Sequence, residues 1–135
     1  MRKPLSAQDI FDLSKAFHEL SIAIGEYRYD HWDELTPTQR TEMEAKQWTL
    51  FNTSSDLNAK SVILRVTLVE NDLKALQSCI KAMTEAADKI ADVKHAISIA
   101  TKAIAFGGAL YLTASTGNVG ALIGATSALV SEIGV

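Results

Sequence analysis

The sequence has very few of the residues that cross-link a chain or interrupt a helix. Its single cysteine, Cys79, excludes an intramolecular disulfide. It has only two prolines, Pro4 and Pro37, and neither proline nor glycine occurs between Pro37 and Gly107. Both residue types disfavour helix interiors, so their absence over this long stretch predicts helices. Regular alternation of polar and apolar residues is also missing, and strands are therefore not expected.

An excess of positive charge is missing too. The 13 lysine and arginine residues are outnumbered by 16 acidic residues, which gives a formal net charge of −3. Nucleic-acid binding needs a basic patch or stripe, so no nucleic-acid partner is expected. The first residues, MRKPLSAQDIFDL, carry two acids within their apolar part and lack the pattern of a cleaved secretory signal. We expect a cytoplasmic protein or one released without a cleaved signal peptide, with membrane association as a further option.

Charge of either sign is absent from residues 103–131. All basic residues and 15 of the 16 acidic residues lie in residues 1–102, and Glu132 is the only charged residue after them. With 135 residues, of which 47% are hydrophobic, one domain with a substantial core is expected. This single domain, residues 1–135, therefore divides into an amphipathic part, 1–102, and a nearly uncharged C-terminal part, 103–135.

The amphipathic part predicts several helices. Ser6 and Asp9 have the spacing of a capping box, and an apolar seam with steps of three and four follows over residues 10–27. The motif TPTQ, residues 36–39, predicts the start of a second helix. The side chains of NTSSD, residues 52–56, compete with the backbone for hydrogen bonds. We therefore expect a break or kink at that segment.

A longer apolar seam follows this segment. It predicts a central amphipathic helix over about residues 57–106, which would be about 75 Å long at about 1.5 Å per residue. This length is unusual for a compact domain, so a bend near residue 71 or 85 stays open. The fold class expected is all-α, an elongated bundle of four to five helices that ends in an apolar C-terminal helical hairpin.

The hairpin contains glycines at regular positions. Gly107 and Gly108 fall within an apolar helix, where two glycines cost about 2 kcal/mol relative to alanine, so the pair predicts a hinge or a close-packing point. Residues 115–118 predict the turn. In the last helix, Gly120, Gly124 and Ala128 recur every four residues, a spacing that lets another helix approach closely.

The apolar side chains of the hairpin need shelter from water. They are expected to drive its burial, and they are Ile97, Ile104, Phe106, Leu110, Leu112, Leu122, Ile123, Leu129 and Val130. Burial within the bundle, coverage by other copies and entry into a bilayer all satisfy this requirement. A transmembrane helix needs about 20 apolar residues. Residues 97–114 are slightly short and include Lys102, so a constitutive span is not expected.

The chain offers little for catalysis or metal binding. Two groupings combine acids with histidine, and they are Glu85, Asp88, Asp92 with His95, and Asp30, His31 with Asp33. Carboxylate-bridged metal bundles repeat such a motif on several helices, and this chain has only three histidines. The first grouping is interpreted as a solvated acidic face, and the second as a polar corner between two helices. No glycine-rich phosphate loop or activated nucleophile is evident, so neither enzymatic activity nor a metal or cofactor is expected.

Aromatic residues gather in one region of the first half of the chain. This aromatic corner consists of Tyr27, Tyr29, Trp32, Trp48 and Phe51. Our main interpretation is that these side chains join the first two helices. A cluster that faces a membrane or a protein partner is the alternative.

Amphipathic helices followed by an uncharged, glycine-containing hairpin resemble the pattern of α-helical pore-forming toxins. The resemblance covers residues 57–135 and implies an apolar hairpin that stays hidden until it meets a membrane. Our leading hypothesis is a non-enzymatic helical protein that forms a homo-oligomer and inserts this hairpin into membrane lipid. The alternative is a soluble structural or adaptor bundle whose hairpin is buried in a homo-oligomer or against a protein partner.

Overall fold

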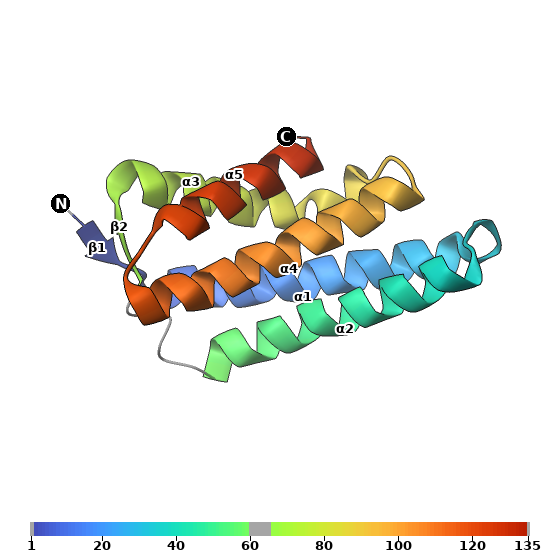
Figure 1. Cartoon of the computed structure of the whole chain (residues 1–135), viewed down its shortest axis with the longest axis horizontal. Helices are drawn as coiled ribbons and strands as arrows, with labels where there is room; N and C mark the ends of the chain where they lie inside the picture. Colours follow the sequence, from blue (N-terminus) through green and yellow to red (C-terminus); the bar gives the residue numbers. More distant parts are fainter. Residues whose placement is uncertain (1, 60–65, 135) are drawn as a thin grey trace.

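The computed structural model describes residues 2–59 and 66–134, and over these residues the protein is an all-α bundle of five helices with one small two-stranded sheet (Figure 1). The helices are α1 (Ala7–Asp30), α2 (Pro37–Ala59), α3 (Glu70–Thr84), α4 (Val93–Thr116) and α5 (Gly120–Ile133). Two 3₁₀ helices, η1 (Trp32–Glu34) and η3 (Ala86–Asp88), and two strands, β1 (Arg2–Pro4) and β2 (Thr67–Val69), complete the fold. The predicted all-α bundle is confirmed.

Helix α1 begins at the predicted capping box. The Ser6 hydroxyl accepts a hydrogen bond from the Asp9 N–H, and the Asp9 carboxylate accepts one from the Ser6 N–H, both at 3.0 Å. The side chain of Gln77 on α3 also donates to Asp9, at 3.1 Å. Burial by itself raises the pKa of Asp9, but the hydrogen bonds from Ser6 and Gln77 outweigh it and the pKa is lowered. The cap therefore also fastens α3 to the start of α1.

Helix α2 begins as predicted but does not break where expected. Thr36 and Gln39 exchange side-chain-to-backbone hydrogen bonds of 2.9 and 3.1 Å. The predicted break at residues 52–56 is wrong, because α2 continues through them to Ala59. Ser54 is buried against α1, and the hydroxyls of Ser14 and Ser54 each donate to the other residue's carbonyl oxygen, at 2.8 and 2.7 Å. Ser54 is thus satisfied by the neighbouring helix, and the Thr53 hydroxyl donates to the Thr49 carbonyl of α2 itself, at 2.9 Å.

The long central helix predicted over residues 57–106 is also wrong. Helix α3 ends at Thr84, η3 follows, and α4 begins after Asp92, whose carboxylate accepts a hydrogen bond of 2.8 Å from the His95 N–H. The structure instead has the alternative bend near residue 85. Two shorter helices bury the two parts of the apolar seam, because α3 packs on α1 and α5 while α4 packs on α2 and α5. One extended helix would leave much of the seam in water. Residues 60–65 of the predicted helix lie outside the described residues.

The expectation of no strands is wrong for two short segments, one near the start of the chain and one directly before α3. Strands β1 and β2 pair antiparallel, with Arg2 opposite Val69 and Pro4 opposite Thr67. The Leu5 N–H donates to the carbonyl oxygen of Val66 at 3.0 Å. Each strand has three residues, which is too short for alternation to be recognised in the sequence.

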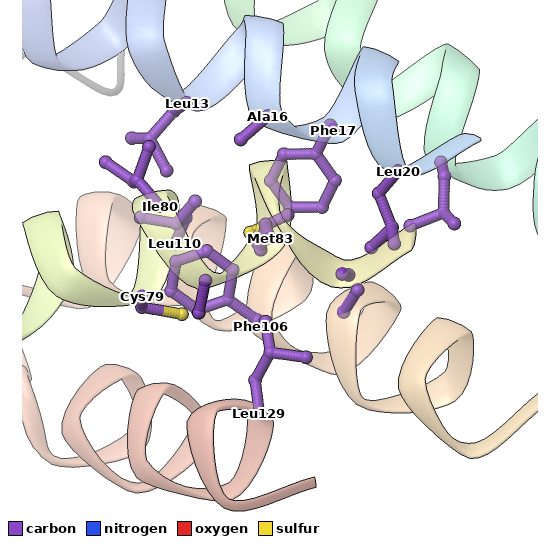
Figure 2. Packing of buried hydrophobic residues seen from close by; sticks show 14 of the residues in the cluster. Leu13, Ala16, Phe17, Leu20, Cys79, Ile80, Met83, Phe106, Leu110 and Leu129 are labelled. Atoms are coloured by element: carbon purple, nitrogen blue, oxygen red, sulfur yellow. The ribbon is translucent and has the colours of Figure 1, made fainter. Parts of the chain in front are cut away.

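The core lies where α1 and α4 meet the other helices. These two helices lie between α2 on one side and α3 with α5 on the other (Figure 1). The rings of Phe17 and Phe106 stack with centroids 5.9 Å apart, and Figure 2 shows Ile80 and Met83 of α3 in the same cluster. All four side chains are buried. Each such side chain contributes about 1.5–3 kcal/mol to stability by leaving water.

Candidate functional site: the C-terminal hairpin

Helices α4 and α5 form an antiparallel hairpin with a short turn. Gly117 ends α4 in the left-handed conformation, with φ of 76°, and its N–H donates to the Thr113 carbonyl at 2.8 Å. The Asn118 side chain accepts a hydrogen bond of 2.9 Å from the Gly120 N–H, at the start of α5. The turn therefore has its hydrogen bonds satisfied locally, and glycine is favoured at its left-handed position.

The apolar side chains of the hairpin divide between the core and the surface. Those buried in the bundle are Phe106, Leu110, Leu122 and Leu129, and those half-buried are Ile97, Ile104 and Val130. Leu112 and Ile123 are different, because 51% and 42% of their surfaces are exposed. The bundle itself thus shelters most of the hairpin, but not all of it.

The glycine pair within α4 lies in two different environments. The helix is continuous through both residues. Gly107 is buried, and a Cβ atom there would lie 3.2 Å from the Thr53 methyl group and 3.3 Å from the Phe17 ring. At Gly108 such an atom would have no neighbour within 4 Å. Gly107 therefore lies at a close approach of three helices, whereas Gly108 faces outward.

The small-residue stripe of α5 is not used for packing among the described residues. Gly120 and Gly124 are exposed and Ala128 is half-buried. A Cβ atom at Gly124 would meet nothing within 4 Å, and one at Gly120 would meet only the Asn118 side chain of the turn. A helix that packs on this stripe would have to come from outside the described chain.

Among the described residues, α4 is long and apolar enough to cross a membrane. It has 24 residues and is about 36 Å long at about 1.5 Å per residue. Its most apolar stretch of 18 residues has a mean hydropathy of 1.4. Half of that stretch is buried in the bundle, as in the central helix of many soluble proteins. Length and composition therefore permit a membrane span without requiring one.

Three polar residues join the open end of the hairpin, and we call them the hairpin clasp: His95, Ser98 and Glu132. The Nε2 atom of His95 lies 2.6 Å from the Glu132 carbonyl oxygen, and the Ser98 hydroxyl donates to the Glu132 carboxylate. The other ring nitrogen of His95, Nδ1, accepts a hydrogen bond of 2.9 Å from the Ala91 N–H. The clasp was not predicted from the sequence, although Glu132 is the only charged residue in residues 103–135.

The described residues hold no group of three or more His, Cys, Asp or Glu side chains arranged to bind a metal. The His95 ring takes part in the clasp, and the Asp92 carboxylate caps α4. In the second grouping, the His31 ring stacks on Tyr27 with centroids 3.9 Å apart. The structure gives these two histidines packing and hydrogen-bonding roles.

The predicted aromatic corner is divided into two groups. At the turn between α1 and α2, the guanidinium groups of Arg28 and Arg40 lie 4.8 and 4.3 Å from the centre of the Trp32 ring. Arg40 also donates two hydrogen bonds, of 3.0 and 2.7 Å, to the Trp32 carbonyl oxygen. The arginines, which the sequence analysis had not considered, therefore join α1 to α2 there. Trp48 and Phe51 lie further along α2, in edge-to-face contact at 5.8 Å.

Trp48 and Phe51 belong to an apolar surface that the sequence analysis missed. We call it the outer aromatic face, and it comprises Phe11, His18, Ile22, Tyr29, Trp48 and Phe51. Its α1 members have spacings of seven, four and seven, which places them along one line of the helix. His18 contacts Phe51 with ring centroids 5.8 Å apart, and 80% of Tyr29 is exposed. The spacing of these α1 residues, on the side of the helix away from its buried seam, was the sequence signal that could have predicted this face.

No family model matches this chain, and no curated protein or solved structure is significantly similar to it. The hairpin combines two long uncharged segments, partial exposure and a polar clasp at its open end, which makes it the strongest candidate site.

Proposed function

We propose that this protein is a non-enzymatic membrane-inserting protein, in which the α4–α5 hairpin leaves the bundle and enters lipid as part of a homo-oligomer. One observation carries the proposal. The uncharged segments of the two helices have similar lengths, with 14 residues in α4 (103–116) and 12 in α5 (120–131, up to Glu132). The nearest charges, Lys102 and Glu132, lie toward the same open end, since the clasp joins that end of α5 to the start of α4.

This charge distribution suits a hairpin that enters the bilayer turn first. The uncharged segments are about 21 and 18 Å long at about 1.5 Å per residue, against about 30 Å for the hydrocarbon core. The turn would therefore reach about 60–70% of the way across, while Lys102 and Glu132 stay at the headgroups. No ionised side chain would need to be buried, and the helices would keep their own backbone hydrogen bonds.

Leaving the bundle would also expose the apolar faces of α1 and α3 that α4 and α5 now cover. Contacts with further copies of the chain would cover them again. The outward stripe of Gly120, Gly124 and Ala128 would let inserted hairpins approach one another closely, as small residues do in membrane helices. Insertion and self-association therefore support each other in this proposal.

Vesicle flotation combined with labelling of Cys79 tests the proposal. Cys79 is fully buried on α3, the helix on which α5 packs, and burial raises the pKa of its thiol to about 12. We expect the protein to float with zwitterionic vesicles. Cys79 should react with a maleimide faster when vesicles are present, while the hairpin inserts and before further copies cover α3. An unreactive thiol and no flotation at any lipid concentration would exclude insertion.

A matched pair of variants makes the test specific to the hairpin. Leu112→Glu places a charge at an exposed position of the hairpin, where a charge in hydrocarbon costs about 2.5–3.5 kcal/mol. Val69→Glu places the same charge at an exposed position outside the hairpin. Leu112→Glu should fold normally and lose flotation, whereas Val69→Glu should float like the wild type. Equal flotation of both variants would contradict the proposal.

The outer aromatic face supports a second candidate function, that of a soluble adaptor. Aromatic residues are enriched where proteins bind one another, and 57% of the Phe11 surface is exposed. An oligomer that forms without lipid, is dispersed by Phe11→Ser with Trp48→Ser, and does not float with vesicles would favour this function over insertion.

A further inference from the structure

A cavity of about 420 Å³ lies between α3 and α5. Its floor includes Leu68, Leu76 and Leu122, which are almost completely buried, and Ile123 and Val130 lie nearer the surface. Small-molecule sites usually measure about 300–1,000 Å³ and are lined mainly by apolar side chains with a few polar groups. The cavity fits this description in both size and lining.

The only charge that the lining of the cavity carries is negative. Asp72, in the first turn of α3, is the only ionisable residue among those that line it, and it is half-buried. The remaining polar lining residues are serines and Thr126, whose hydroxyl already donates to the Leu122 carbonyl at 2.7 Å. A ligand that complements this lining has an aliphatic body and a positively charged head.

We propose that this cavity binds one long-chain aliphatic amine. The alkyl chain lies over the leucines of the floor, and the ammonium group pairs with the Asp72 carboxylate. The ligand would contact α3 and α5 together, so it would stabilise the closed bundle by mass action. The inference does not rest on membrane insertion, because it requires only the closed bundle in the absence of lipid.

Calorimetric titration of the full chain with dodecylamine, below its micellar concentration, tests the proposal. Dodecanoate has the same alkyl chain with the opposite charge and serves as the matched ligand. We expect one equivalent of dodecylamine to bind, about fivefold more tightly than dodecanoate. This fold-change is about the largest that a partly exposed ion pair contributes to affinity. Asp72→Asn should remove this preference. Equal binding of the two ligands to the wild type, or no binding of dodecylamine, would overturn the proposal.

A second pair of variants tests the location. Ser127 is exposed at the rim of the cavity, and Ser127→Trp should obstruct it, whereas Ala121→Trp adds the same ring to an exposed position of α5 outside the lining. Dodecylamine binding should be lost in the first variant and kept in the second, with circular dichroism to verify folding. If both variants bind equally, the site lies elsewhere and the proposal fails. Because no vesicles are present, neither result affects the flotation test.

Discussion

Gly107 and Gly108 are neighbours in one helix, yet substitution should change stability in opposite directions. Gly107→Ala would bring a Cβ atom to 3.2 Å from Thr53 and 3.3 Å from Phe17. Overpacking of a core costs about 1–3 kcal/mol, and the higher helix propensity of alanine offsets up to about 1 kcal/mol of this cost. Gly107→Ala should therefore be destabilising. Gly108→Ala meets no neighbour and should gain about 0.5–1 kcal/mol. Urea denaturation of the two variants measures both changes, and a loss of stability in Gly108→Ala would contradict this account of α4.

The Asp9 carboxylate should make stability depend on pH in the acidic range. Its pKa is lowered below the ordinary value of 3.8, so the ionised form is the one that the fold stabilises. This contribution is complete above pH 3.8 and is lost as the pH falls through the lower folded pKa. The advantage of the wild type over Asp9→Asn in free energy of unfolding should therefore be larger near neutral pH than well below pH 3.8. An advantage that does not change with pH would show that the charge of Asp9 is unimportant.

Among the elements, the hairpin clasp should control how readily α5 separates from α4. The clasp supplies the polar contacts at the open end of the hairpin. Its hydrogen bonds are partly buried, so removal of a partner should cost less than the roughly 1–3 kcal/mol of a fully buried bond. His95→Ala should lower the hydrogen-exchange protection of α5 and accelerate maleimide labelling of Cys79 without lipid. Thr101→Ala is the control, because its hydroxyl bonds only to the Ile97 carbonyl of the same helix. Equal protection of α5 in the two variants would mean that apolar packing alone holds α5.

At the level of elements, sequence patterns that depend on a few neighbouring residues were reliable. The capping boxes at Ser6 and Thr36 formed as expected, because each needs only residues three positions apart. The continuity of helices was not reliable. Residues 52–56 are helical, and the Ser54 hydroxyl among them is satisfied by Ser14, forty positions away in the chain. Such a partner is known only when the helices are in place.

For the whole molecule, the outward face of α5 should determine how many copies assemble. Gly124→Leu adds a side chain where nothing in the described chain lies within 4 Å, so the fold should be retained. The added bulk should block close approach of a second hairpin and prevent oligomers in vesicles. Gly108→Leu is the control, as another exposed helical glycine outside the stripe. Chemical cross-linking on vesicles measures the result, and unchanged oligomers in Gly124→Leu would exclude the stripe as the contact.

The candidate site was likewise only partly evident from the sequence. The absence of charge from residues 103–131 identified the hairpin directly. The clasp, the outer aromatic face and the cavity all combine residues from different helices, as when His95 of α4 meets Glu132 of α5. No spacing within a single helix encodes such pairs.

The sequence by itself determined the all-α class, the helix starts at Ser6 and Thr36, and the uncharged C-terminal segment. These features follow from local propensity, capping and composition, which act over a few residues. Only the tertiary structure decided that the long seam divides between α3 and α4, that Gly107 is enclosed while Gly108 is open, and that Glu132 closes the hairpin. The physical reason is that apolar burial and hydrogen-bond satisfaction depend on which helices become neighbours, and residues distant in the chain supply those neighbours.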